Sequence, residues 1–155
     1  MVISFLGHRK IYYHQELEKQ IFNLLRDIIV KTNEISFLFG SKSQFIELCY
    51  RVVSKLKEEF NYVKRIYVRA EYPKTNHEYE KYIRKLYEDS YYFDKSNRAF
   101  KLNYIKRNEL MIDKSDLCIF YYNKEYCLNT KNISGTEIAY RYASKKGKKI
   151  INCYI

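Results

Sequence analysis

The chain contains little glycine and proline, with four glycines and one proline among its 155 residues. Flexible linkers and collagen-like or disordered chains are rich in these two residues, so the composition argues against all three. The length fits one domain, and we expect a single domain over residues 1–155. Each of the few glycines should then lie where the local backbone conformation or a close approach requires it.

The sequence also lacks long hydrophobic runs. A membrane-spanning helix needs about 20 consecutive apolar residues, and no run approaches that length. The short apolar stretch at residues 2–6 has no basic region before it, unlike a secretory signal peptide. We therefore expect a soluble, cytoplasmic protein without a membrane partner.

The four cysteines, Cys49, Cys118, Cys127 and Cys153, include no C-x-x-C pair. Three of them lie in apolar segments, where a free thiol packs well. We interpret the cysteines as reduced core residues. Neither a metal site nor a cofactor is predicted.

The 46% of hydrophobic residues are arranged in two alternating patterns. Short apolar runs are typical of strands, and apolar residues at helical spacing are typical of helices. The expected strands are Val2–Leu6, Ile35–Phe39, Val63–Val68, Leu117–Tyr122 and Lys149–Ile155. The expected helices are 17–29, 45–56, His77–Asp89, Phe100–Lys114 and Ser134–Lys146, the last capped by Gly147.

Alternating strands and helices predict an α/β fold, a Rossmann-like three-layer domain with a five-stranded, mostly parallel sheet. We expect the strand order 3-2-1-4-5. The order reverses between the first and fourth strands, where open parallel sheets bind their ligands. The aromatic run at residues 91–93 remains open to three interpretations: a lid that stacks on a base, an extra edge strand, or a dimer contact.

Three glycines follow predicted strands and therefore lie at the carboxyl edge of the sheet. Glycine there lets the main chain approach a ligand, and the helix that follows offers its first amides to an anion. Each could instead only permit a tight turn. Neither the G-x-G-x-x-G nor the P-loop pattern is present. The three turns are Gly7-His8-Arg9-Lys10, Gly40-Ser41-Lys42-Ser43 and Ser134-Gly135-Thr136-Glu137.

These turns, together with two further segments, resemble the SLOG superfamily, in the branch of small stand-alone proteins of the YpsA type. The segments that carry the resemblance are 5–9, 37–41, 104–108, 112–116 and 134–136. The resemblance implies a Rossmann-like domain that binds nucleotides or nucleotide-derived ligands. The superfamily includes phosphoribohydrolases, DNA-processing proteins and sensors of ADP-ribose-type signals.

The resemblance also assigns residues to the ligand. Its phosphate and ribose should meet Gly7, His8 and Arg9, the turn of Gly40, Ser41, Lys42 and Ser43, and the segment of Ser134, Gly135 and Thr136. Arg107 and Asn108 should face the same cleft. From their place after the third strand, Glu71 and Tyr72 could contact ribose or base. Arg9 and Lys42 could equally be solvated surface cations.

Catalysis is a second reading of the same site, with Glu137 as acid or base and Arg107 orienting the phosphate. The phosphoribohydrolases carry their glutamate two or three residues after the threonine, whereas Glu137 follows Thr136 directly. One helical position rotates a side chain by about 100°, so Glu137 could miss the glycosidic bond.

The net charge of +11 fits two kinds of partner. A positive field speeds the capture of a small anion, and it also attracts nucleic acid. The lysines are spread along the chain, which favours a small ligand over nucleic acid. We therefore expect a module that binds a nucleotide or an ADP-ribose-like ligand as a sensor or sequestering protein. An N-glycosidic hydrolase is the alternative, nucleic-acid binding ranks below both, and a homodimer remains open.

Overall fold

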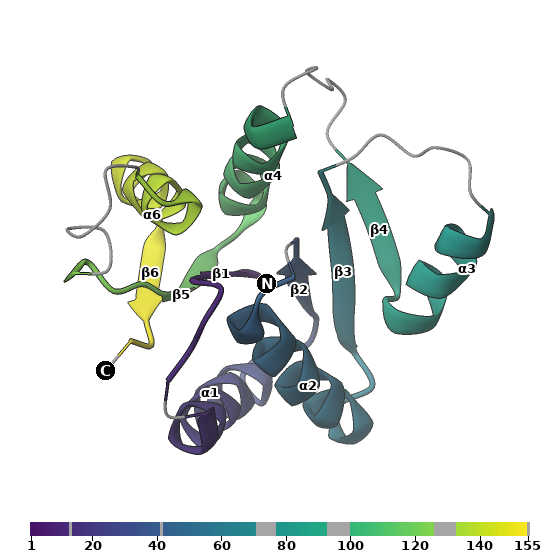
Figure 1. The fold of residues 1–155 in the computed structure, drawn as a ribbon. Helices are drawn as coiled ribbons and strands as arrows, with labels where there is room; N and C mark the ends of the chain where they lie inside the picture. Colours follow the sequence, from purple (N-terminus) through teal and green to yellow (C-terminus); the bar gives the residue numbers. More distant parts are fainter. Residues whose placement is uncertain (13, 41, 71–76, 93–99, 126–132, 155) are drawn as a thin grey trace.

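The computed structural model describes the chain except residues 13, 41, 71–76, 93–99, 126–132 and 155 (Figure 1). The strands are β1 (Val2–Gly7), β2 (Ile35–Phe39), β3 (Val63–Arg69), β4 (Asp89–Tyr92), β5 (Leu117–Tyr121) and β6 (Lys149–Asn152). The described helices are α1 (His14–Ile29), α2 (Gln44–Glu59), α3 (His77–Leu86), α4 (Phe100–Lys114) and α6 (Gly135–Lys145). None of these helices has the length and apolar character that crossing a bilayer requires.

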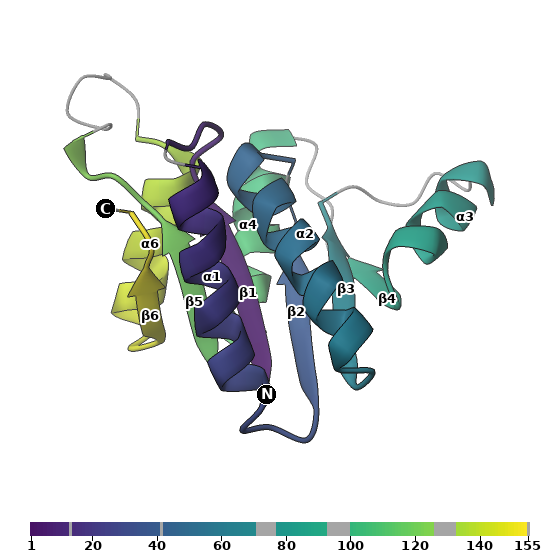
Figure 2. The same ribbon diagram turned by 90° about the horizontal axis from the view of Figure 1, so that it is seen from below.

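The strands form one six-stranded sheet in the order β4-β3-β2-β1-β5-β6, and every neighbouring pair is parallel. Parallel neighbours cannot be joined by a tight turn, so the connections must cross over a face of the sheet. Helices α1 and α2 cover one face and α4 and α6 the other, while α3 lies beyond β4 (Figures 1 and 2). The predicted α/β, Rossmann-like arrangement is confirmed.

The predicted number of five strands is wrong, because β4 adds a sixth at the edge of the sheet. The expected order 3-2-1-4-5 corresponds to β3-β2-β1-β5-β6, and β4 pairs with β3 outside it. β4 has four residues, and among the described strands β3 is its only neighbour. Such a strand needs no continuous apolar run, so its sequence lacks the signal of a buried strand. For Tyr91 and Tyr92 the edge-strand interpretation is confirmed, whereas residue 93 lies outside the description.

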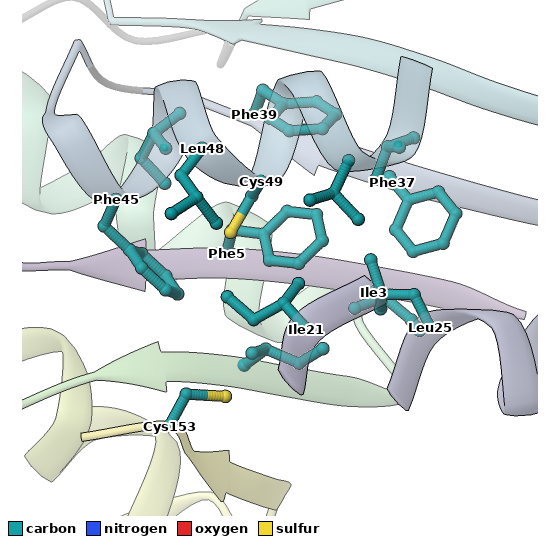
Figure 3. Packing of buried hydrophobic residues seen from close by; sticks show 14 of the residues in the cluster. Ile3, Phe5, Ile21, Leu25, Phe37, Phe39, Phe45, Leu48, Cys49 and Cys153 are labelled. Carbon is teal, nitrogen blue, oxygen red and sulfur yellow. The ribbon is translucent and has the colours of Figure 1, made fainter. Parts of the chain in front are cut away.

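The main core lies between the sheet and helices α1 and α2 (Figure 3). Successive strand residues point to opposite faces, and Ile3 and Phe5 of β1 point to this one. The ring of Phe5 lies 5.7 Å from that of Phe37 and 5.3 Å from that of Phe39, centroid to centroid. All these side chains are buried, which makes this face the principal source of hydrophobic stabilisation.

The opposite face carries two smaller apolar clusters under α4 and α6. One consists of Leu6, Ile112, Cys118, Phe120, Ala139 and Ala143. The other consists of Leu38, Val68 and Met111. Two alanines contribute from α6, so this helix packs on the sheet through small side chains.

The described cysteines are buried, free thiols, as predicted. Cys49 and Cys153 belong to the core under α1 and α2, and Cys118 to the opposite face. Burial raises the pKa of the Cys153 thiol to about 11, which keeps it protonated and unreactive. Cys127 lies outside the described residues. No group of potential metal ligands occurs among the residues that are described.

The predicted cap at Gly147 is also confirmed. Its φ of 65° lies in the left-handed region, which glycine adopts without steric cost. Its amide donates to the carbonyl oxygen of Ser144, and the next amide, of Lys148, donates to that of Ala143, each at 3.0 Å. These bonds satisfy carbonyl groups at the end of α6 before β6 begins.

Candidate functional site

The carboxyl ends of the strands meet at one edge of the sheet. β1 ends at Gly7, and its neighbours β2 and β5 end at Phe39 and Tyr121. The chain order reverses at β1, which has β2 on one side and β5 on the other. Open α/β sheets bind ligands at such a switch point, so this edge is the candidate site.

Buried polar side chains are concentrated near this edge. Among the described residues the buried polar or charged side chains are Ser4, His8, Ser43, Arg69, Asn103, Arg107, Ser115 and Glu137. Five of these eight follow a strand, end one, or lie in the first turn of a helix that starts at this edge; Arg107 lies at the middle of α4, and Ser4 and Ser115 lie elsewhere. Burying a charge costs free energy unless it is paired, so such a concentration marks a place built for polar chemistry.

His8 is held directly after β1 by main-chain hydrogen bonds. Its amide donates to the carbonyl oxygen of Tyr121 at 3.1 Å, and the amide of Asn123 donates to its Nε2 at 3.0 Å. The ring lies 5.7 Å from the ring of Tyr122. Burial lowers the pKa of His8 below its usual 6.5, because the imidazolium is poorly solvated there. His8 is therefore a neutral imidazole at pH 7.

Arg107 lies across the end of β2, and the absence of a side chain at Gly40 makes room for it. A Cβ added to Gly40 would lie 2.8 Å from Cδ and Nε of Arg107 and 2.6 Å from Sδ of Met111. The guanidinium donates through Nε and one terminal nitrogen to Oδ1 of Asn108, at 3.2 and 3.1 Å. It also lies 5.2 Å from the ring centroid of Tyr104. Arg107 is thus a buried cation in a fixed orientation.

The start of α6 is open. Ser134 caps the helix by accepting a hydrogen bond from the amide of Glu137 at 3.1 Å. A Cβ added to Gly135 would meet nothing within 4 Å, so the main chain there is approachable. Asn108 of α4 and Gly135 line the same narrow groove between the two helices. The structure therefore brings two of the predicted segments together.

Glu137 is buried in the first turn of α6, and its carboxylate forms an ion pair with Arg141 one turn later. The glutamate side chain is 8% exposed and that of the arginine 67%. A carboxyl group at this position is the candidate acid or base.

The start of α2 differs, because the chain itself fills it. A Cβ at Gly7 would lie 2.5 Å from a ring carbon of Phe45, so this glycine accommodates core packing. The amide of Gln44 donates to the carbonyl oxygen of Arg9 at 3.0 Å, and Ser43 accepts from the amide of Ile46 at 3.3 Å. The predicted turn after β1 thus contacts the start of α2.

The remaining predicted residues have different environments. Arg9 and Lys42 are exposed, and Thr136 is half-buried beside Gly135. Ser41, Glu71 and Tyr72 lie outside the described residues.

The sequence analysis missed two buried polar residues at this edge, Arg69 and Asn103. Arg69 ends β3, and Asn103 lies in the first turn of α4. Neither belongs to a motif. The only signal for Arg69 was its place after an apolar strand.

Comparison with known proteins does not assign the chain to a family. No family model matches the chain, and no curated protein is significantly similar to it in sequence. The resemblance to the SLOG superfamily therefore stays a prediction, and the function must be argued from the geometry of the carboxyl edge.

Proposed function

We propose that this protein binds a nucleotide or a nucleotide-derived, ADP-ribose-like ligand at the carboxyl edge of its sheet, as a sensor or sequestering module. One observation carries the proposal. Asn108 of α4 lines one groove with Gly135 at the open start of α6, and its side-chain oxygen accepts hydrogen bonds from the buried guanidinium of Arg107. An approachable helix N-terminus, with a buried cation linked to its lining through Asn108, suits a phosphate.

The phosphate would bind at the open start of α6. The first amides of an α-helix lack intrahelical acceptors and carry the positive end of its dipole, so α6 offers donors at Gly135 and Thr136. Arg107 would supply a planar pair of N–H donors. Gly135 allows close approach because its position has open space.

An aromatic ring for the base is available on the same helix as Arg107. Tyr104 is 44% exposed, and the guanidinium of Arg107 lies near its ring. Stacking of a base on a tyrosine contributes about 1–3 kcal/mol. The ligand would then contact one turn of α4 through both its base and its phosphate.

Calorimetry with AMP, ADP-ribose, NAD and cyclic nucleotides tests the proposal. We expect binding to be weakened about 10- to 100-fold by Arg107→Gln, since a hydrogen bond to a charged group contributes about 1.5–3 kcal/mol. Gly135→Ala should weaken binding without lowering stability. The matched control is Arg51→Gln, which removes an exposed arginine from α2, far from this edge.

A folded protein that binds none of these ligands at millimolar concentration would refute the proposal. Equal binding by Arg107→Gln and the parent would refute the assigned site. If single-stranded RNA or DNA binds instead, with an affinity that falls steeply with salt, the positive charge serves nucleic acid.

Hydrolysis of an N-glycosidic bond is a second candidate, favoured by the buried carboxylate of Glu137 beside the proposed phosphate site. Its ionised form could activate water. Chromatography of nucleoside monophosphates incubated with the protein would detect a released base. Glu137→Gln should abolish that release, and unchanged release would exclude this glutamate.

A further inference from the structure

A second hollow lies away from the switch point, between α3 and the β3–β4 edge of the sheet. Helix α3 lies beyond β4 and apart from the other helices (Figures 1 and 2). The hollow has a volume of about 550 Å³, which is within the range of small-molecule sites. It is lined by Arg69, Ile83, Arg84, Tyr87, Glu88, Asp89 and Ser90.

Arg69 is the unusual member of this lining. It is the last residue of β3 and is only 7% exposed, although arginine is seldom buried. One terminal nitrogen donates to Oγ of Ser90 on β4 at 3.1 Å. A guanidinium carries five N–H donors in one plane, a geometry that matches an oxyanion.

The acidic residues of the lining are already engaged. Glu88 pairs with Arg65 at 2.7 Å and with Lys57 at 3.8 Å, and these cations, with the accepted hydrogen bonds, keep the pKa of its carboxyl below the usual value despite burial. Asp89 accepts a hydrogen bond from the amide of Ser90 at 2.7 Å. Arg65 and Lys57 thus balance Glu88, which leaves Arg69 and Arg84 of the described lining against Asp89, and the local field favours an anion.

Ile83 and Tyr87 form the apolar part of the described lining. Ile83 is buried, and the ring of Tyr87 stacks on that of Tyr67 at 5.2 Å between centroids. The polar part of the lining is the larger one, so the hollow suits a small polar ligand with a short carbon skeleton. Inorganic ions alone would not need this wall.

We propose that this hollow is a second ligand site, which takes a small organic molecule with a phosphate or carboxylate group. Arg69 and Arg84 would bind the oxyanion, Ser90 would orient Arg69, and the wall of Ile83 and Tyr87 would cover the carbon skeleton. β3 is two strands from β1, roughly 10 Å at the spacing of a sheet. The site is therefore separate from the nucleotide site proposed above.

Amide chemical shifts measured by NMR during titration of the full chain test this site. The probes are glycerol phosphate and succinate, which carry the same kind of short carbon skeleton with different oxyanions. We expect one or both to shift the amides of residues 83–90, and the tighter probe identifies the oxyanion. Inorganic phosphate, titrated alone, should bind more weakly than glycerol phosphate because it cannot use the wall.

Two variants that should fold normally test the contribution of each arginine to binding. Arg84 is exposed, so Arg84→Gln should fold normally and weaken binding about 10-fold. Arg69→Lys keeps the charge and removes the planar donor pair, and it should weaken binding further. Arg51→Gln is the control and should bind like the parent.

The proposal is overturned if neither probe shifts these amides, or if Arg84→Gln and Arg69→Lys, shown to be folded, bind as well as the parent. Gly135→Ala separates the two sites, because it should impair only nucleotide binding. If Gly135→Ala also abolishes binding of glycerol phosphate, the anion occupies the switch point and no second site exists.

Discussion

The two faces of the sheet differ in what they bury. Under α1 and α2 one continuous apolar cluster includes phenylalanines from β1, β2 and α2. Under α4 and α6 the apolar clusters are small, and the helices bury Arg107 at the middle of α4 and Glu137 in the first turn of α6. One face of the sheet therefore stabilises the fold by hydrophobic burial, while the other holds charged groups whose burial costs stability.

Adjacent residues of β1 provide the sharpest test of this comparison. Phe5 points toward α1 and α2, and its neighbour Ser4 toward the other face. Phe5→Ala should lower the free energy of unfolding by about 3–5 kcal/mol, because it leaves a cavity among aromatic rings. Ser4→Ala should change it by less than about 1 kcal/mol. Denaturation by urea measures both, and equal losses would contradict the assignment of stability to one face.

The stability of two glycine variants, one on each side of the sheet, is a second test of this difference. Gly7→Ala places a Cβ against the ring of Phe45, which is fully buried and cannot yield, so we expect a loss of about 1–3 kcal/mol. Gly135→Ala meets open space at the start of a helix, so stability should be unchanged or raised by up to about 1 kcal/mol. Thermal unfolding of the two variants checks this. A destabilised Gly135→Ala would show that the start of α6 is closed.

The smallest expected effect is the pH dependence contributed by His8. Its pKa in the folded state is lowered by burial, so the unfolded chain binds a proton at a higher pH than the folded protein. The stability from a neutral His8 is complete above about pH 6.5 and falls as the pH drops from there toward the folded-state pKa. Unfolding measured between pH 7.5 and pH 5 should show this slope. His8→Gln should remove it, and a slope that persists in that variant must come from other groups.

Much of the fold could be predicted from the sequence, because buried parallel strands are apolar throughout and amphipathic helices repeat their apolar residues. The segments Ile35–Phe39 and Phe100–Lys114 were predicted with the observed bounds. β4 was not counted among the five predicted strands, and an edge strand was only one of three interpretations of the aromatic run, since such a short strand depends on its neighbour β3 more than on its own residues.

The candidate site was only partly predictable. The turns at Gly40 and Gly135 could be recognised from their composition. The sequence did not show why each position holds a glycine. Only the folded chain shows that Arg107 and Met111 occupy the space beside Gly40, whereas Gly135 faces open space. Arg69 belongs to no motif and became visible through its burial beside Ser90.

The sequence by itself determined the α/β class and the carboxyl-edge position of the glycine turns, because periodicity and turn residues act over a few neighbouring positions. The tertiary structure decided which of those turns is filled by the chain and which is open. It also brought Asn108 and Gly135 to one groove, since these residues are distant along the chain and only the crossover of helices on one face of the sheet brings α4 and α6 side by side.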